Sequence, residues 1–247
     1  MPKSIYMFHA IGSGDELHDC DPHYSYSKEN FIAFLKDCGS VTSLKEVLVG
    51  NKIDAVVTFD DGHISNFEAA LAIKETVNGC ADFFINPSMV GKTHFMSWAD
   101  IRQINDLGMS IQSHSLDHVY LSDLNYKQQY EQLLSSKKII EDNIGSAVTI
   151  LAPPGGRYNQ DTIDICKEIG YQHVSISKPG RWSQGYISPR IAVLNGYPVA
   201  DLVNCKNTFS PLLYKQVFKY QLTGLAKTVL GNKRYDGIRS RLLGAQE

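Results

Sequence analysis

The chain has 247 residues, a length that suits a single α/β barrel and is ample for a large buried core. Hydrophobic residues make up 43% of the sequence and charged residues 20%, which is ordinary for a soluble globular protein. The formal net charge of -2 gives no reason to expect a nucleic-acid partner.

The predicted elements alternate between short apolar strands and amphipathic helices. In chain order they are a strand at 5–9, a helix at 30–38, a capping box at 43–46, a strand at 55–59, a helix at 66–77, a strand at 81–86, a helix at 97–108, a strand at 109–113, a helix at 126–143, a strand at 148–152, a helix at 162–169 and a strand at 173–177. This alternation predicts a mainly parallel sheet, either open or closed into a barrel.

The last segment differs in charge from the rest of the chain. Residues 206–247 contain eight basic residues against Asp236 and Glu247, which leaves a formal charge of about -8 on the remainder. We therefore divide the chain into a barrel domain, 1–205, and a basic helical C-terminal extension, 206–247. One helical face is predicted from Leu213, Val217, Tyr220, Leu225, Val229 and Leu230. That helix either packs on the barrel with a solvated basic side, or rests on anionic lipid or a phosphate-bearing substrate.

Cysteine usage and the apolar runs bear on the compartment. The five cysteines are widely spread and form no CxxC pair, which argues against a disulfide framework and for a reducing compartment. The stretch from Met1 to Phe8 is too short for a signal peptide, and no run approaches the roughly 20 apolar residues of a membrane helix. We expect a cytoplasmic protein, with possible contact to the inner membrane face through the basic extension.

Polar clusters follow the predicted strands at the places where function gathers in parallel sheets. Asp60 and Asp61 end an apolar run, and His114 and His118 are spaced so that both imidazoles can aim at one point. Two histidines and one carboxylate form a suitable shell for a divalent metal with open positions for water and substrate. The adjacent residues Asp60 and Asp61 can then have different roles, because one can bind the metal while the other faces the substrate.

Three motifs together resemble a known family. The stretches Thr58-Phe59-Asp60-Asp61-Gly62, His114-Ser115-Leu116-Asp117-His118 and Pro153-Pro154-Gly155-Gly156-Arg157-Tyr158-Asn159 occur in this order. They are similar to the first three motifs of the polysaccharide deacetylase family, also called the NodB-homology domain or carbohydrate esterase family 4. The resemblance covers residues from about 5 to 195.

The resemblance implies a fold, a cofactor and a reaction. The fold is a distorted (β/α) barrel with about seven parallel strands, the cofactor is a divalent metal, with zinc expected and cobalt, nickel or manganese as alternatives, and the reaction removes an acetyl group from an N-acetylated sugar. Asp60 resembles the catalytic base, and the backbone amide of Gly155 resembles an oxyanion donor. The metal ligands would be Asp61, His114 and His118.

The chemistry of amide hydrolysis agrees with these roles. A metal ion lowers the pKa of water towards about 7 and polarises the carbonyl group. A main-chain N–H that holds the oxyanion is worth about 3–4 kcal/mol, and the departing amine needs a general acid.

The sequence departs from the commonest family pattern at two positions. No histidine follows His173, so the late histidine that supplies the acid is missing, and the stretch from Tyr6 to Ile11 resembles a circularly permuted variant that carries this histidine on the first strand. His9 is therefore our candidate for the general acid. Ala152 stands where the family has an arginine, and Arg190 is the candidate substitute.

Sugar contacts are assigned from the proline-glycine motif and from a later loop. Pro154 and Tyr158 belong to the motif, and Trp182 follows Pro179 and Gly180. The expected substrate is an N-acetylated carbohydrate, either a polysaccharide, an oligosaccharide or a glycolipid precursor. The alternatives are a catalytically impaired sugar-binding relative and, less favoured by the βα pattern, a non-haem iron oxygenase.

Overall fold

The computed structural model describes residues 4–12, 17–50 and 55–230, with side chains in the last helix described up to residue 223. Eight strands form the main sheet, and every recorded pair within it is parallel. They are β1 Ser4–Phe8, β4 Ala55–Phe59, β5 Asp82–Ile85, β6 Ser110–Ser113, β7 Ile150–Leu151, β8 His173–Ile176, β9 Ile187–Pro189 and β10 Ile191–Ala192. A small second sheet pairs β2 Ala10–Ile11 with β3 Ser25–Tyr26.

The strand order β10-β1-β4-β5-β6-β7-β8-β9 places two segments that are adjacent in sequence at opposite edges of the sheet. Only Arg190 separates β9 from β10, so one stretch of chain crosses from the last strand to the first and nearly closes the barrel. The eight strands therefore come from seven chain segments, and the predicted distorted barrel of about seven parallel strands is confirmed.

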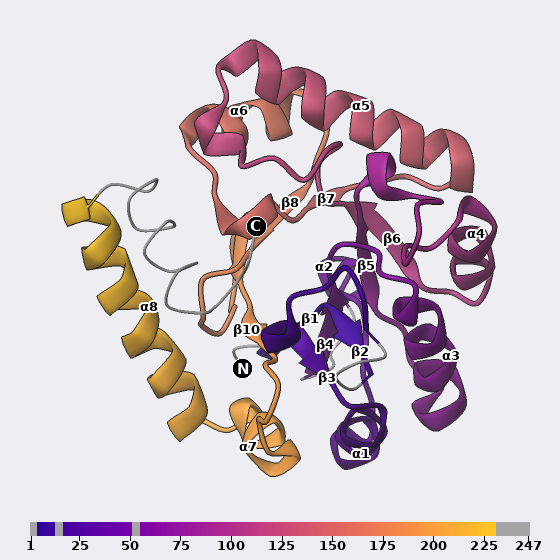
Figure 1. Cartoon of the computed structure of the whole chain (residues 1–247), viewed down its shortest axis with the longest axis vertical. Coiled ribbons are helices and arrows are strands. Elements are labelled where there is room, and N and C mark those ends of the chain that lie inside the picture. Colours follow the sequence, from indigo (N-terminus) through magenta and orange to yellow (C-terminus); the bar gives the residue numbers. More distant parts are fainter. Residues whose placement is uncertain (1–3, 13–16, 51–54, 231–247) are drawn as a thin grey trace.

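Helices surround the sheet in chain order, except for the short helix at 44–48, which lies over the middle of the barrel (Figure 1). They are α1 Lys28–Cys38, α2 Leu44–Leu48, α3 Ser65–Val77, α4 Trp98–Asp106, α5 Tyr126–Ile144, α6 Gln160–Glu168, α7 Val199–Val203 and α8 Pro211–Leu230. Capping residues fix the first turn of two of these helices. Ser97 and Asp100 form a reciprocal capping box at the start of α4. The Ser43 hydroxyl accepts a hydrogen bond from the Glu46 N–H at the start of α2. Sequence patterns did not predict β2, β3, β9, β10 and α7, each of which has five residues or fewer.

Alternation along the strands separates an outer core from an inner one. In β4, Val57 and Phe59 belong to the cluster that includes the helix residues Phe31 and Ile73, so they face the helices. Val56 belongs to a second cluster, inside the barrel, which also contains Ile5, Phe84, Ile150 and Trp182. Because side chains alternate along a strand, the position that continues the inward row beyond Val56 and Thr58 is Asp60.

The C-terminal extension packs on the barrel through one side of α8. Leu212 and Leu213 are buried, whereas Tyr214 and Phe218 on another side are 57% and 63% exposed. Figure 1 shows α8 at the border of the molecule, and Gln216 of α8 donates at 2.7 Å to the carbonyl oxygen of Ala192, the last residue of β10. The predicted face residues Leu225, Val229 and Leu230 lie outside the described side chains.

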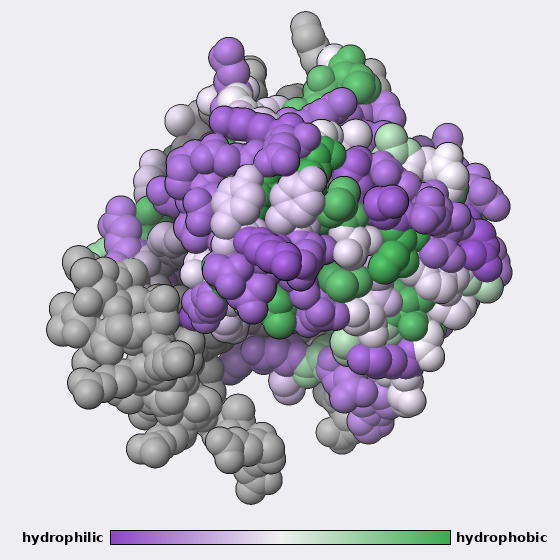
Figure 2. Space-filling view, turned by 90° about the horizontal axis from the view of Figure 1, so that it is seen from above, coloured by the Kyte–Doolittle hydropathy of each residue, from purple (hydrophilic) through white to green (hydrophobic). Residues whose placement is uncertain are grey.

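The surface seen from above is mainly hydrophilic, with hydrophobic residues scattered among polar ones (Figure 2). Within the described residues, no helix combines the length and apolar character needed to cross a membrane.

Candidate active site

Residues from separate strands meet at the carboxyl end of the barrel. His9 follows β1, Asp60 follows β4, and His114 follows β6. Gly155 lies in the short 3-10 helix Pro154–Gly156 after β7, and Arg190 lies between β9 and β10. Because parallel strands end at the same edge, the barrel gathers side chains that are far apart in the sequence.

Asp60 and Arg190 form a buried ion pair. Arg190 Nη1 is 2.6 Å from Asp60 Oδ1, and Nη2 is 2.8 Å from Oδ2, so the guanidinium donates to both carboxylate oxygens. Arg190 is 0% exposed, and its Nη1 also lies 3.3 Å from Thr58 Oγ1. Burial raises the pKa of Asp60, but Arg190, through its charge and hydrogen bonds, and the charges of His114 and His9 together outweigh it, so the pKa lies below its ordinary value.

Asp61, His114 and His118 are brought together as predicted. Asp61 Oδ1 lies 3.3 Å from His114 Nε2 and 3.2 Å from His118 Nε2. Ligands of a tetrahedral zinc ion with bonds of about 2.05 Å lie about 3.3 Å apart. The donor set and its spacing therefore fit a divalent metal, and among the described residues this is the cluster that could hold one.

The ring of His114 is oriented by a backbone carbonyl group. His114 Nδ1 lies 2.7 Å from the carbonyl oxygen of Ala152, which accepts from the protonated Nδ1 and leaves Nε2 as the metal-facing atom. The Asn86 side chain donates to the carbonyl oxygen of His114, and at 3.3 Å to that of Ser115. Ser115 Oγ donates at 3.0 Å to Gln132, so the loop that carries the ligands is held from both sides.

Left-handed backbone conformations concentrate at this cluster. Asp61, Ser115 and His118 have φ values of 73°, 67° and 57°, although none of them is glycine. Such conformations are uncommon for residues with a Cβ and persist where surrounding contacts enforce them. The strain therefore supports a functional role for these turns.

His9 lies beside the two aspartates with an unsatisfied nitrogen. Its Nδ1 is buried and has no hydrogen-bond partner among the described residues, and its ring centroid is 4.4 Å from that of Tyr24. Burial lowers the pKa of His9, and the charges of Asp61 and Asp60 raise it by less. A buried nitrogen without a partner is available to a bound molecule.

Gly155 is held in a conformation and a space that favour glycine. Its φ is 59°, and a Cβ there would lie 2.7 Å from Cε1 of Tyr120. The guanidinium of Arg157 lies 4.1 Å from the centroid of the same Tyr120 ring. The ring therefore occupies the space that a side chain at position 155 would need. Tyr120 is 39% exposed, and the sequence did not indicate it, because the contact joins distant segments.

Of the three residues predicted to contact sugar, two are buried and one is half-buried. Pro154 is buried, and Tyr158 is half-buried against the outer core. Trp182 is 8% exposed and lies in the inner cluster, where its ring meets His173 at 5.2 Å between centroids. The expectation that Trp182 stacks on a sugar does not fit this position, because the segment after Gly180 turns back into the barrel.

Comparisons with known proteins agree with the geometry. Residues 49–174 match the family model for polysaccharide deacetylases. The Bacillus subtilis protein YxkH, a polysaccharide deacetylase by name, is 27% identical over 184 residues, which are 73% of this chain and 66% of that protein. A peptidoglycan-N-acetylglucosamine deacetylase of Bacillus cereus is 28% identical over 130 residues, 52% of this chain and 58% of that protein. The chain thus spans less than two thirds of the length of these relatives.

The fold is shared with solved structures. The Streptococcus pyogenes deacetylase PplD, solved in complex with acetate, aligns with a TM-score of 0.74 and 22% identity over 83% of this chain and 97% of that one. The structure of IcaB from Ammonifex degensii aligns with a TM-score of 0.67 and 18% identity over 78% of this chain and 91% of that one. The matched residues span half of the sequence and contain Asp60, Asp61, His114 and His118, and the chain belongs to the polysaccharide deacetylase family.

Proposed function

We propose that this protein is a metal-dependent hydrolase that removes the acetyl group from an N-acetylated sugar of a polysaccharide, an oligosaccharide or a glycolipid precursor. The proposal rests on one observation: two adjacent carboxylates lie in different environments. Asp60 is fixed by Arg190, and Asp61 lies among two imidazole nitrogens. A base and a metal site side by side are what hydrolysis of an amide requires.

The metal, when bound by Asp61, His114 and His118, supplies Lewis acidity that activates water and polarises the acetyl carbonyl. Zinc is the proposed ion, with cobalt, nickel or manganese as alternatives. Asp60 takes the proton from the attacking water, and Arg190 keeps its carboxylate ionised and aimed. The Gly155 N–H stabilises the developing oxyanion.

His9 donates the proton to the departing amine in this proposal. Its buried Nδ1 without a partner and its closeness to the two aspartates support that role. Arg190 is proposed as the replacement for the motif arginine, because it reaches Asp60 from a different strand.

The test measures acetate release from a panel of N-acetylhexosamines by the parent, Asp60→Asn and His9→Ala. Activity that falls by about a hundredfold or more in both variants supports the assignment. An active His9→Ala variant would overturn the general acid and leave the hydrolase in place.

A sugar-binding relative without catalysis is the remaining alternative. It predicts that Asp60→Asn binds the sugar as well as the parent does and that the parent releases no acetate. The oxygenase alternative loses ground, because the scaffold expected for it was an all-β jelly roll and the chain forms a parallel barrel.

We also propose that the C-terminal extension contacts anionic lipid. The exposed side chains Tyr214, Phe218 and Leu222 recur every four residues along α8, and Lys215 and Lys219 accompany them. Aromatic and basic side chains on one exposed helix are suited to an anionic interface. Residues 206–235 include no acidic residue, so pairing of the same helix from a second copy would bring like charges together.

A further inference from the structure

His9 lies at the point where the chain leaves the main sheet for the small one. It is the single residue between β1, which pairs with β4, and β2, which pairs with β3. The parallel register of β2 and β3 places Ala10 opposite Ser25. One residue earlier on both segments, the same register sets Tyr24 opposite His9.

The rings of these two residues are in contact. Their centroids are 4.4 Å apart and their planes meet at 49°. Aromatic pairs with centroids about 4.5–7 Å apart attract each other, so this pair is at the close end of the range. Because Nδ1 of His9 has no hydrogen-bond partner among the described residues, no hydrogen bond at that nitrogen fixes the rotation of the ring. The contact with Tyr24 therefore restrains the imidazole.

The backbone around His9 is held by the start of α3. The Asn66 side chain donates at 2.5 Å to the carbonyl oxygen of His9. The Ile11 N–H donates at 3.0 Å to Ser65 Oγ. These bonds fix where the His9 side chain begins, and they leave its ring free to turn about the side-chain torsions.

Tyr24 is itself held in place from both sides. It ends the 3-10 helix Pro22–Tyr24, in which the carbonyl oxygen of His23 accepts from the Asn195 N–H at 2.9 Å. After it, the Tyr26 hydroxyl donates at 3.0 Å to the carbonyl oxygen of Tyr197. The small sheet and the chain that follows β10 thus present a fixed ring to the site.

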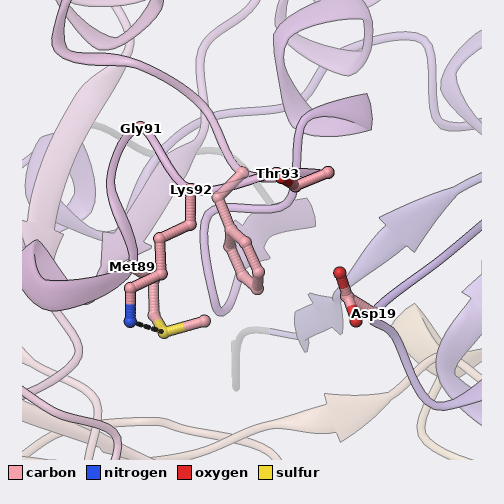
Figure 3. Close-up of a pocket in the computed structure, with 6 residues that line it drawn as sticks. Asp19, Met89, Gly91, Lys92 and Thr93 are labelled. Atoms are coloured by element: carbon pink, nitrogen blue, oxygen red, sulfur yellow. Dashed lines mark hydrogen bonds between the residues drawn. The ribbon is translucent and has the colours of Figure 1, made fainter.

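The chain that leads into this 3-10 helix borders open space. Asp19 stands across a pocket of about 650 Å³ from Lys92 and Met89 (Figure 3). Packing at the start of the segment is therefore sparse, and the hydrogen bonds at His23 and Tyr26 determine where the segment lies.

We propose that Tyr24 is a positioning residue for His9, because its ring holds the imidazole in the orientation from which it protonates the departing amine. The proposal rests on the proposed function, in which His9 is the general acid. In that step the imidazolium gives its proton to the amine nitrogen as the C–N bond breaks, and the ring becomes neutral. Tyr24 supplies a fixed surface and no proton, so its hydroxyl is not required. A displacement of about 1 Å in a reacting group can cost about a hundredfold in rate.

A double-mutant cycle on acetate release from an N-acetylhexosamine tests whether Tyr24 acts through His9. We expect kcat to fall about tenfold in Tyr24→Ala and about a hundredfold in His9→Ala. The double variant should be no slower than His9→Ala alone, because no acid is left to position. Losses that multiply to about a thousandfold in the double variant would overturn the proposal.

Two further variants separate the ring of Tyr24 from its hydroxyl and from general packing. Tyr24→Phe keeps the ring and should retain kcat within about twofold. A Tyr24→Phe variant as slow as Tyr24→Ala would overturn the role of the ring. Tyr130→Ala is the matched control, because Tyr130 is also a half-buried tyrosine but packs on the outer core from α5. A loss of kcat in Tyr130→Ala equal to that in Tyr24→Ala would assign the effect to lost packing.

Crystal structures of the parent, Tyr24→Phe and Tyr24→Ala test the contact without turnover. We expect one orientation of the His9 ring in the first two, and a rotated ring or several orientations in Tyr24→Ala. An unmoved His9 ring in Tyr24→Ala would overturn the proposal whether or not the parent releases acetate. A parent that releases no acetate, with a His9 ring that moves in Tyr24→Ala, would overturn the proposed function and leave the positioning contact in place.

Discussion

At the scale of single residues, the Asp60–Arg190 pair is the contact on which the site depends. Both side chains are buried. Removing either one would leave the charge of the other without a partner. The sequence predicted Asp60 from its motif and Arg190 only as a candidate, because local sequence carries no signal for a contact between residues 130 positions apart. The same limit explains why Tyr120 was missed.

Replacing Arg190 with methionine should cost both stability and activity. Removing one partner of a buried pair costs about 3–5 kcal/mol, because the other charge stays buried without compensation. We also expect the pKa of Asp60 to rise and acetate release to fall by about a hundredfold or more. Urea unfolding and acetate release measure the two effects, and a variant within about 1 kcal/mol of the parent would contradict a structural role for the pair.

Gly155→Ala should disturb the turn that carries the proposed oxyanion donor. The new Cβ would lie 2.7 Å from Tyr120 Cε1, so either the ring or the turn must move. Gly145→Ala is the matched control, since Gly145 also has a left-handed φ, of 67°, but nothing within 4 Å of its Cβ position. We expect kcat to fall about tenfold or more in Gly155→Ala and to stay near the parent value in the control.

Adding Tyr120→Ala to Gly155→Ala should restore part of the lost kcat, because it removes the colliding ring. An equal loss in the single and double variants would show that the collision is not the cause.

At the scale of elements, alternation along β4 explains why Asp60 points into the barrel. The strand and helix pattern was readable from the sequence because each long element carries its own periodicity. The strands β9 and β10, of three and two residues, could not be predicted from the sequence, because segments this short show no periodicity. Their position is nevertheless decisive, since the residue between them is Arg190.

The hydrogen bond between Asp82 of β5 and the start of α2 predicts that stability depends on pH. Asp82, at the start of β5, is fully buried and accepts from the Leu44 N–H at the start of α2. Burial raises the pKa of Asp82 to about 6. The folded state therefore holds a proton that the unfolded state loses above about pH 4, so this group's contribution to stability falls as pH rises from about 4 to 6.

Asp82→Asn removes that dependence. The difference in unfolding free energy between variant and parent should shift by roughly 3 kcal/mol in favour of the variant as the pH rises from about 4 to about 6.5. This change corresponds to the raised pKa of Asp82, about two pH units above its ordinary value. Urea unfolding of both proteins at the two pH values measures the change. A constant difference between parent and variant would contradict the raised pKa of Asp82.

His173→Asn should show the opposite dependence. Burial inside the barrel lowers the pKa of His173 to about 4, so the unfolded state binds the proton first and stability from this group rises between about pH 4 and 6.5. Relative to the parent, the variant should therefore lose unfolding free energy across that interval. The same urea series measures it, and a slope of the other sign would contradict burial of the neutral ring.

At the scale of the whole molecule, the family barrel was predictable because three motifs with fixed order identify it. The pocket of Figure 3 and the exposed face of α8 were not, because both depend on how distant segments pack. The division of the chain into barrel and basic extension remains a proposal that agrees with the exposure of α8.

Replacing Tyr214, Phe218 and Leu222 together with serine should reduce binding to vesicles that contain anionic phosphatidylglycerol by about tenfold or more. These side chains are 57%, 63% and 51% exposed, so the barrel should fold without them. Co-sedimentation with anionic vesicles and with neutral phosphatidylcholine vesicles provides the measurement. Equal sedimentation of parent and variant would argue against a lipid contact through α8.

The most direct measurement of the central claim is acetate release by the parent after chelation and after zinc is restored, with Asp60→Asn alongside. The proposed function predicts that release stops on chelation and returns with zinc. It also predicts that Asp60→Asn binds zinc with the affinity of the parent, measured by calorimetry, yet releases acetate at least about a hundredfold more slowly. Release that persists without metal, or an Asp60→Asn variant as active as the parent, would contradict it.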